Sequence, residues 1–374
     1  MKIAILSLHR GGMLHYAAML ARSIHSVDPD AELGAFICAD ASGCLFPREA
    51  RLFSYRVPQV LGLRHAGAFL QGPFTLAALY RDVIHWKPDL LHINSGHLWY
   101  SGLVRGWSRH FPVVTTIHDI HVHPGEVRPY ERLKLNPLLR HSRRILVHSE
   151  SLRNEALKTW SLPPDRVGVI PCGLLCVPGC ERPSGDEQDL NVLMFGRIHA
   201  YKGFDVLFKA MPRLIREFPA LRLTIAGEGN LSAWPEACSG LKENLRIINR
   251  YISDDETARL FREASIVLLP YTEASQSGVA LMAAAFGRPV VASRVGAIPE
   301  VVDDAETGLL VSPGDPKAFA EAVAGLLKDP ERRRRMGTLA RERGESRFGP
   351  QAIGSRLRKV YCEVLSESIR GVRA

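Results

Sequence analysis

The sequence lacks a long apolar run, and its seven cysteines are few and odd in number. No stretch of the 374 residues reaches the roughly 18 apolar residues that a bilayer-spanning helix needs. An odd cysteine count in a chain of this length does not suggest a disulfide framework. Residues Met1–Leu8 turn polar too soon for a secretory signal and are typical of a first buried strand. We therefore expect a reduced, cytoplasmic protein.

Several motifs that would fix a function are also missing. The turn Leu8–Met13 has no G-x-G-x-x-G and no ribose-binding acid follows it, which argues against an NAD-dependent oxidoreductase. No D-x-D pair follows a predicted strand, since Asp28–Asp30 lies in a helix–strand turn. His121 and His123 have no visible third metal ligand. The net charge of +9 comes with no nucleic-acid-binding motif. We expect no cofactor, no metal and no nucleic-acid partner.

Short runs of valine, isoleucine and leucine alternate with amphipathic stretches along the whole chain. The runs do not alternate apolar with polar residues, which is typical of parallel strands buried on both faces. The predicted strands are Ile3–Leu8, Leu33–Cys38, Leu90–Ile93, Val113–Ile117, Arg144–Val147, Gly168–Ile170, Asn191–Phe195, Arg222–Ala226, Leu245–Ile248, Ile266–Leu269, Pro289–Ala292 and Gly308–Val311. The predicted helices are Met13–His25, Thr75–His85, Ser149–Trp160, Phe204–Glu217, Asp254–Arg262, Ala280–Phe286, Pro316–Leu327 and Ile353–Leu365. This order predicts an α/β fold with doubly wound sheets.

Residues 171–190 are rich in proline, glycine and polar side chains, which is typical of a linker. We therefore predict a first domain over residues 1–180 and a second over residues 181–352. Cys172, Cys176 and Cys180 follow a C-x3-C-x3-C spacing that matches no usual zinc site, so we interpret it as coincidence. In two doubly wound domains a ligand is expected between the domains, at the carboxyl ends of the strands.

Glycine-bearing turns follow several predicted strands. Gly11 and Gly12 open the first helix, where free N–H groups face an anion, although a plain tight turn explains them equally well. Arg197 and Lys202 lie with Gly196 on the loop after Asn191–Phe195, where two cations would neutralise a diphosphate leaving group. Later strand ends carry Gly227, Tyr251, Ile252, Glu273, Ser277, Gly278 and Val279.

Taken in order, these motifs resemble those of the retaining GT-B glycosyltransferases of family 4. Residues 191–311 carry G-R-x4-K-G, A-G-x-G, Y-[IV]-S-D-x-E and F-G-x-P-V-V-A-S-x-V-G-x-I-P-E in the family's order and spacing. In the first half, Thr115–Asp119 resembles T-x-H-D, Ile145–Glu150 resembles V-x-x-S-E, and Val169–Gly173 resembles I-P-N-G. The resemblance implies the GT-B fold: an acceptor-side and a nucleotide-sugar-binding Rossmann-like domain facing one cleft. A C-terminal helix at about residues 353–374 would pack back on the first domain.

The resemblance also implies a role for each matching residue. The implied catalytic residues are His118, Arg197, Lys202 and Glu273. The implied substrate-binding residues are Gly11, Gly12, Gly196, Gly227, Tyr251, Ile252, Ser277, Gly278 and Val279. By this resemblance Arg197 and Lys202 bind the donor diphosphate and His118 lies beside the donor sugar. The backbone of Tyr251 and Ile252 would read the base.

One departure concerns the nucleotide. The family pattern has two glutamates in an E-x7-E arrangement, and Glu273 can stand for the first. The place of the second falls on Leu281 or Met282, and neither is acidic. In the family that carboxylate grips the ribose, so the resemblance leaves ribose recognition unassigned. Glu300 is a substitute candidate, and an ordinary loop or helix-start role accounts for it better.

The implied function is transfer of a sugar from a nucleotide-diphosphate sugar to a glycan or lipid-linked acceptor with retention, in cell-surface polysaccharide or glycoconjugate synthesis. UDP, as the commoner carrier, is favoured over GDP. Same-face transfer, in which the departing diphosphate helps deprotonate the acceptor, requires no metal. A nucleotide-sugar 2-epimerase of the same fold and a non-catalytic sugar-binding protein stay open as alternatives, and the oligomeric state is not predicted.

The charge is unevenly distributed. Residues 1–180 hold 20 Lys and Arg against 13 Asp and Glu, together with 13 of the 14 histidines. Residues 181–374 hold 28 against 26. By the resemblance the first half receives the acceptor. We therefore expect an anionic partner there: a lipid-linked diphosphate, an acidic glycan, or the inner face of the membrane, to which the protein would bind peripherally.

Overall fold

The computed structural model describes residues 1–39, 45–57, 66–121, 130–175, 177, 180, 188–241 and 243–372. The chain divides into two compact units. Unit 1 comprises Met1–Ile120, Arg128–Gly173 and Phe348–Ala374, and unit 2 comprises His121–Val127 and Leu174–Arg347. Cys176, His123 and the predicted linker residues 181–187 lie outside the described residues. By sequence, unit 1 carries 25 Lys and Arg against 14 Asp and Glu, and unit 2 carries 23 against 25.

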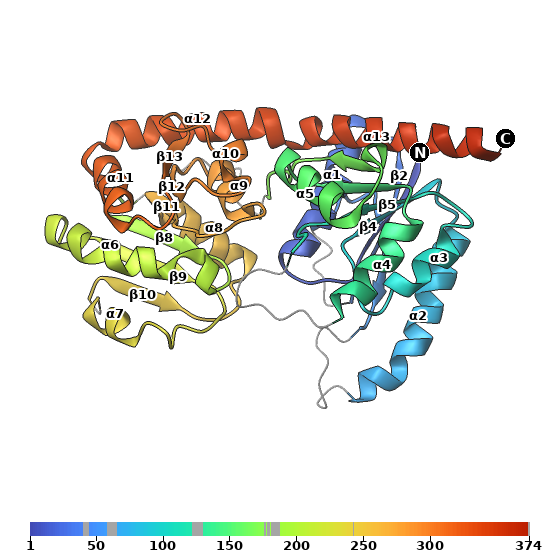
Figure 1. The fold of residues 1–374 in the computed structure, drawn as a ribbon, viewed down its shortest axis with the longest axis horizontal. Helices are drawn as coiled ribbons and strands as arrows, with labels where there is room; N and C mark the ends of the chain where they lie inside the picture. The colour runs from blue at the N-terminus through green and yellow to red at the C-terminus, as the bar shows by residue number, and fades with distance from the viewer. Residues whose placement is uncertain are drawn as a thin grey trace. The chain divides into compact units, whose positions relative to one another are not determined.

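Unit 1 is built on a parallel sheet of seven strands in the order β3-β2-β1-β4-β5-β6-β7. Strands β2, β4 and β5 of this sheet are labelled in Figure 1. The strands are β1 (Lys2–Ser7), β2 (Glu32–Cys38), β3 (Arg51–Tyr55), β4 (Leu90–Asn94), β5 (Val113–Thr116), β6 (Arg144–Val147) and β7 (Val167–Val169). The helices are α1 (Gly12–Val27), α2 (Ala66–Trp86), α3 (Val104–Trp107), α4 (Glu131–His141), α5 (Glu150–Trp160) and α13 (Pro350–Val372). The strand order reverses between β1 and β4, and such a switch point is where doubly wound sheets bind ligands.

Helices cover both faces of this sheet because its strands are apolar on both sides. Leu91 and Ile93 of β4 pack with residues of α2, α3 and α4 in one core. Side chains alternate along a strand, so His92 faces the other side, where it meets Tyr361 of α13. There α13 lies against α1 so closely that a Cβ at Gly354 would come within 2.0 Å of the Ser23 carbonyl oxygen. The C-terminal helix is thus part of unit 1.

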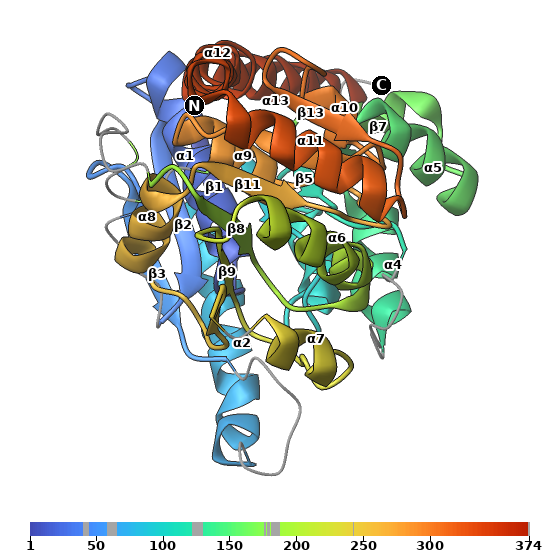
Figure 2. The ribbon, with the colours of Figure 1, turned by 90° about the vertical axis from the view of Figure 1, so that its left-hand side faces the viewer.

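Unit 2 holds a six-stranded parallel sheet in the order β10-β9-β8-β11-β12-β13. The strands are β8 (Asn191–Phe195), β9 (Arg222–Ala226), β10 (Leu245–Ile248), β11 (Ile266–Leu269), β12 (Val290–Ser293) and β13 (Gly308–Val311). The helices are α6 (Phe204–Glu217), α7 (Pro235–Gly240), α8 (Asp254–Glu263), α9 (Gly278–Ala285), α10 (Ile298–Val301), α11 (Pro316–Lys328) and α12 (Pro330–Phe348). In Figure 2, α6 and α11 lie side by side over one face, and α8 and α9 pack in the core of the other. The order reverses between β8 and β11.

The predicted doubly wound α/β fold is confirmed, and the sequence analysis missed some elements. Strand β3 and helices α3, α4, α7, α10 and α12 were not predicted. The second predicted helix begins earlier than expected, since α2 starts at Ala66 and contains Pro73. Among the described residues, no helix is both long and apolar enough to cross a membrane.

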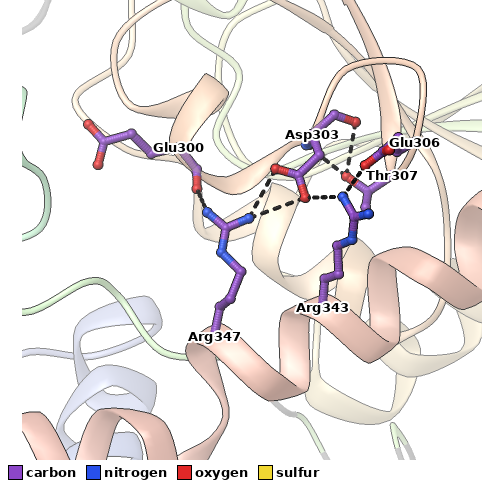
Figure 3. A network of polar contacts seen from close by, with 6 residues as sticks. All are labelled: Glu300, Asp303, Glu306, Thr307, Arg343 and Arg347. Atoms are coloured by element: carbon purple, nitrogen blue, oxygen red, sulfur yellow. Dashed lines mark hydrogen bonds and ion pairs between the residues drawn. The ribbon is translucent and has the colours of Figure 1, made fainter.

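A network of ion pairs fastens the end of α12 to the loop that follows α10 (Figure 3). The Asp303 carboxylate accepts from Arg343 at 2.6 Å and from Arg347 at 3.1 Å. Arg343 also pairs with Glu306, and Arg347 donates to the Glu300 carbonyl oxygen at 2.6 Å. Burial raises the pKa of Asp303, but the two guanidinium groups more than offset this and hold that pKa below its ordinary value. The network therefore fixes the last turns of α12 within unit 2.

Candidate functional site

The carboxyl ends of β8 and β9 form interlocked glycine turns in unit 2. The Gly196 N–H donates to the Ala226 carbonyl at 2.9 Å. A Cβ at Gly227, whose φ is 146°, would lie 2.1 Å from the Gly196 carbonyl oxygen, so no other residue fits there. Gly203, with φ 78°, is equally constrained, since its Cβ would lie 1.7 Å from the Pro270 carbonyl oxygen. These close approaches bring the loop after β8 against the end of β11.

Lys202 is held at this junction by an aromatic residue. Its Nζ donates to the Tyr271 hydroxyl at 2.6 Å and lies 4.1 Å from the centre of that ring. Burial, together with the neighbouring Arg197, lowers the pKa of Lys202 to about 8, and Tyr201 opposes this shift. Hydroxyl and ring do not neutralise the ammonium. Lys202 is therefore a cation whose charged form an anionic ligand would stabilise.

The N-terminus of α9 lies beside this lysine. Ser277 caps the helix, its hydroxyl accepting from the Ala280 N–H at 3.2 Å, and it also bonds the Tyr271 hydroxyl. Within the described residues the N–H groups of Gly278 and Val279 donate to no other group. A Cβ at Gly196 would lie 3.7 Å from Val279 and 3.8 Å from the Lys202 Nζ. A lysine, two free amides and an open glycine thus meet at the switch point of this sheet.

The other predicted residues of unit 2 lie on neighbouring loops. Arg197 and Glu273 are exposed after β8 and β11. Tyr251 exposes 63% of its surface and Ile252 only 8%, just before Ser253 caps α8. Their roles in holding the nucleotide and sugar stay predictions.

The place of the missing second glutamate is apolar in the structure as well. Leu281 of α9 is 1% exposed, and Met282 is half-buried against the core of β11 and α8. Glu300 is exposed, and its backbone carbonyl bonds Arg347. The two α9 positions therefore carry no carboxylate, and Glu300 lies on α10 instead.

Unit 1 offers a second cluster at its own switch point. Gly11, with φ 59°, ends the turn after β1, and a Cβ at Gly11 or Gly12 would meet nothing within 4 Å. The backbone there is therefore open to a ligand. The amide of Asn94, at the end of β4, donates to the Met13 carbonyl at 2.7 Å. This bond ties the first turn of α1 to the neighbouring strand.

Two buried histidines extend this cluster. The His118 Nε2 lies 2.7 Å from the Asn94 Oδ1, and its Nδ1 lies 2.9 Å from the His148 Nε2. The His148 Nδ1 in turn lies 3.0 Å from the Ile170 carbonyl oxygen. The Tyr16 ring meets both imidazoles edge-on, at 4.7 and 5.1 Å between centroids. Burial, reinforced by neighbouring histidines, lowers the pKa of His118 well below its ordinary value.

Both ring nitrogens of His118 are therefore engaged within unit 1. The predicted contact of His118 with a donor sugar would therefore be made by its backbone atoms or by the carbon atoms of its ring. Sequence reasoning missed Asn94, His148 and Tyr271. A signal for His148 was present: Thr116 pairs with Leu146, so two residues further on the register sets His118 opposite His148.

The predicted absence of a metal stays a prediction. In the part of the chain that the structure describes, no group of three His, Cys, Asp or Glu side chains is arranged to hold a metal ion. His121 belongs to a pair whose other member, His123, lies outside that part.

Comparisons with known proteins agree with this architecture. The family model described as "Glycosyltransferase Family 4" matches residues 10–174, and that described as "Glycosyl transferases group 1" matches residues 189–329. A D-inositol 3-phosphate glycosyltransferase 2 of Catenulispora acidiphila is 31% identical over 80% of this chain and 76% of its own length. The chain belongs to the family 4, group 1 glycosyltransferases.

Solved structures show the same fold at low sequence identity. The sucrose-phosphate synthase of Thermosynechococcus elongatus superposes with a TM-score of 0.72 at 21% identity, covering 98% of this chain and 99% of that one. Anabaena HepE in complex with UDP-glucose gives a TM-score of 0.69 at 16% identity, covering 98% and 100%. The predicted GT-B fold, with two Rossmann-like domains, is confirmed, and the protein is a glycosyltransferase.

Proposed function

We propose that this glycosyltransferase transfers a sugar from a UDP-sugar to a glycan or lipid-linked acceptor with retention of configuration. The observation that carries the donor assignment is the meeting of Lys202, Gly196 and the α9 N-terminus at the β8–β11 switch point. A diphosphate there would receive one charge-assisted bond from Lys202 and two from the free amides of Gly278 and Val279. The complex of the similar HepE structure with UDP-glucose favours UDP as the carrier.

In this proposal, retention arises because the departing diphosphate is held on the face from which it leaves. Lys202, Arg197 and the helix dipole stabilise charge on the departing diphosphate, which is where charge develops as the glycosidic bond breaks. A diphosphate oxygen held on that face can accept the proton of the acceptor hydroxyl, so the new bond forms on the face that the leaving group vacates. Arg197 and Glu273, both exposed on adjacent loops, complete the donor side in this proposal.

Unit 1 supplies the acceptor side, and its excess charge suits an anionic acceptor or surface. A hollow of about 760 Å³ at the amino ends of β5 and β6 is lined by Arg109, Arg140, Arg143 and Arg166, and also by Asp165 and by Glu367, which pairs with Arg143. Arg109 and Arg140 form no ion pair with any described residue, and together with Arg105 they reinforce the effect of burial in lowering the pKa of His141. This hollow lies at the opposite end of the strands from Gly12. We therefore assign it to an anionic membrane surface at the inner face, with the acceptor entering at the other edge.

The decisive experiment measures donor binding and turnover together. Thermal shifts with UDP and GDP identify the carrier, and UDP alone should stabilise the protein. Lys202→Ala should lose that shift, whereas Lys209→Ala, which replaces an exposed lysine on the following helix α6, should keep it. If UDP stabilises Lys202→Ala as much as the unaltered protein, the diphosphate does not bind at this site. Conversion of a UDP-sugar to an isomeric sugar without any acceptor would instead indicate a 2-epimerase.

A further inference from the structure

In unit 2, the chain that follows β9 stays joined to the chain that follows β10. A backbone bond runs from the Gly227 N–H to the Ile248 carbonyl at 3.0 Å. Next to it, the Asn249 side chain takes the place of a strand. Its Nδ2 donates to the Gly229 carbonyl at 2.9 Å, and its Oδ1 accepts from the Gly229 N–H at 3.0 Å. An amide that donates to and accepts from one residue reproduces the pairing of a peptide unit. Asn249 therefore holds the loop after β9 from the β10 side.

The loop after β8 holds Gly229 from the other side. The Ile198 N–H donates to the Glu228 carbonyl at 2.8 Å, and Ile198 pairs with Gly229 in an isolated parallel bridge. A Cβ at Gly229 would lie 2.3 Å from the Ile198 carbonyl oxygen, so this approach excludes any side chain at position 229. Gly229 thus lies between Ile198 and Asn249, and it joins the loops that follow β8, β9 and β10.

Each of the two outer loops carries one part of the proposed donor site. The diphosphate loop, residues 196–203 after β8, contains Arg197 and Lys202. The base segment, residues 250–253 after β10, contains Tyr251 and Ile252. These two parts are distant in sequence, and the contacts of Gly229 bridge them in the structure. The spacing between the two parts therefore depends on those contacts.

The base segment is also held at its far end, by α8. The Arg250 guanidinium donates to both oxygens of the Glu256 carboxylate, at 2.8 and 2.9 Å, and to the Tyr251 carbonyl at 3.1 Å. The Ser253 hydroxyl caps α8 and accepts from the Glu256 N–H at 3.3 Å. These bonds attach the segment to α8, while Asn249, directly before it, attaches it to the loop after β9. With both attachments in place, the base segment has a fixed position relative to the diphosphate loop.

We propose that Asn249 is a positioning residue that fixes the distance between the base segment and the diphosphate loop. The proposal rests on the proposed function, in which a nucleoside diphosphate binds to both. Such a ligand engages two parts of the site at once, so a spacing that is already correct saves the cost of ordering one part after the other has bound. A ligand that engages only one part gains nothing from the spacing. Asn249 therefore acts on affinity without touching the nucleotide.

Binding of a whole nucleotide and of its two halves tests this role. The Kd values of UDP, uridine and pyrophosphate are measured for the unaltered protein and for Asn249→Ala, which loses both bonds to Gly229. We expect the Kd of UDP to rise about tenfold, and those of uridine and pyrophosphate to change less than about twofold. An unchanged Kd for UDP overturns the proposal. An equal rise for all three ligands also overturns it, because Asn249 would then support each part separately.

Asn244→Ala is the matched control for a loss of stability. The Asn244 amide also makes two bonds to backbone, donating to the Pro219 and Leu221 carbonyls at 2.9 and 2.8 Å. It directly precedes β10, at the opposite end of that strand from Asn249. Asn244→Ala should therefore lower the stability of unit 2 about as much as Asn249→Ala, but leave all three Kd values unchanged. An equal loss of UDP affinity in both variants overturns the proposal.

A second measurement uses the unaltered protein alone. Hydrogen exchange of the Gly229 amide reports opening of the contact, since this N–H donates to the Asn249 Oδ1. Saturating UDP should slow this exchange about fivefold or more, and saturating uridine or pyrophosphate should change it less than about twofold. Equal slowing by uridine and UDP refutes the positioning role. Failure of both UDP and GDP to bind refutes the proposed donor and this inference with it, whereas equal binding of UDP to Asn249→Ala refutes the inference alone.

Discussion

Lys202 makes the donor affinity depend on pH in a way that can be calculated. Burial places its pKa at about 8, against an ordinary value of 10.5. If only the charged form of Lys202 binds the diphosphate, the observed Kd for UDP is the intrinsic Kd divided by the fraction of free enzyme in which Lys202 is protonated. We expect about a twofold rise at pH 8 and about a tenfold rise at pH 9, relative to pH 7.

The assay is a titration of UDP binding between pH 7.5 and pH 9.5, where the terminal phosphate, with a pKa of about 6, is fully ionised. Lys202→Arg is the control, because a guanidinium stays charged over this range. At pH 7.5 the Kd of Lys202→Arg for UDP should be higher than that of the unaltered protein, because the larger guanidinium does not fit against the Tyr271 hydroxyl. This Kd should not change with pH. Lys202→Ala should weaken binding about 10- to 100-fold at pH 7.5, as expected for the loss of a charge-assisted bond.

The same lysine should lower stability below pH 8. The pKa in the folded protein is lower than in the unfolded chain, so between about pH 8 and 10.5 the unfolded chain binds more protons and the free energy of unfolding rises with pH. Denaturant titrations of Lys202→Met should lack this rise. A Kd for UDP that stays constant up to pH 9.5 in the unaltered protein would refute the reasoning. So would a Kd that rises with pH in Lys202→Arg as steeply as in the unaltered protein.

Three further predictions concern Tyr271, Asp303 and the pair Arg109 and Arg140. Tyr271→Phe keeps the ring beneath Lys202 but loses the 2.6 Å bond, so kcat/KM should fall about fivefold, and an unchanged value would show that the hydroxyl does not position the lysine. Asp303→Asn should cost about 0.5–1 kcal/mol in urea unfolding at pH 7, because the ion pairs are partly exposed and screened by solvent. The difference should shrink as the pH falls below about 4, because the lowered pKa of Asp303 stabilises the fold only while the carboxylate is charged. Replacing Arg109 and Arg140 together by glutamate should abolish flotation with anionic liposomes at low salt, and the same charge change at two unit 2 positions should not.

The sequence predicted most of the fold because buried parallel strands are nearly continuous apolar runs. It missed β3, which is an edge strand whose residues Arg51–Tyr55 are mostly exposed. It also missed α12, where four successive arginines suggest a solvated segment. One of them, Arg333, is 1% exposed, because its guanidinium reaches Asp189 at 2.5 Å and the Leu326 carbonyl. Such a buried cation depends on a partner distant in sequence, which periodicity does not reveal.

The candidate site was predictable where it lies on glycine turns and not where it depends on pairing between strands. Gly196 and Gly203 are recognisable because they stand in one short loop with Arg197 and Lys202, although the close approach that requires glycine at 203 is to the distant Pro270 carbonyl oxygen. Tyr271 follows β11, and nothing in its own segment points to Lys202, 69 positions earlier in the chain. Asn94 and His148 likewise meet His118 only through the order β4-β5-β6. A sheet order combined with the strand register would have set His118 opposite His148, but not Lys202 beside Tyr271.

The excess of histidine and the excess of charge in the first half of the chain have separate causes. The sequence places 13 of 14 histidines before residue 181, and together with the net charge this suggested one anionic partner. In the structure His9, His92, His97, His118 and His148 are kept neutral by burial. Rings that carry no charge do not attract an anion over a distance. An attraction to an anion over a distance would come from arginines such as Arg109 and Arg140 at the other end of the sheet.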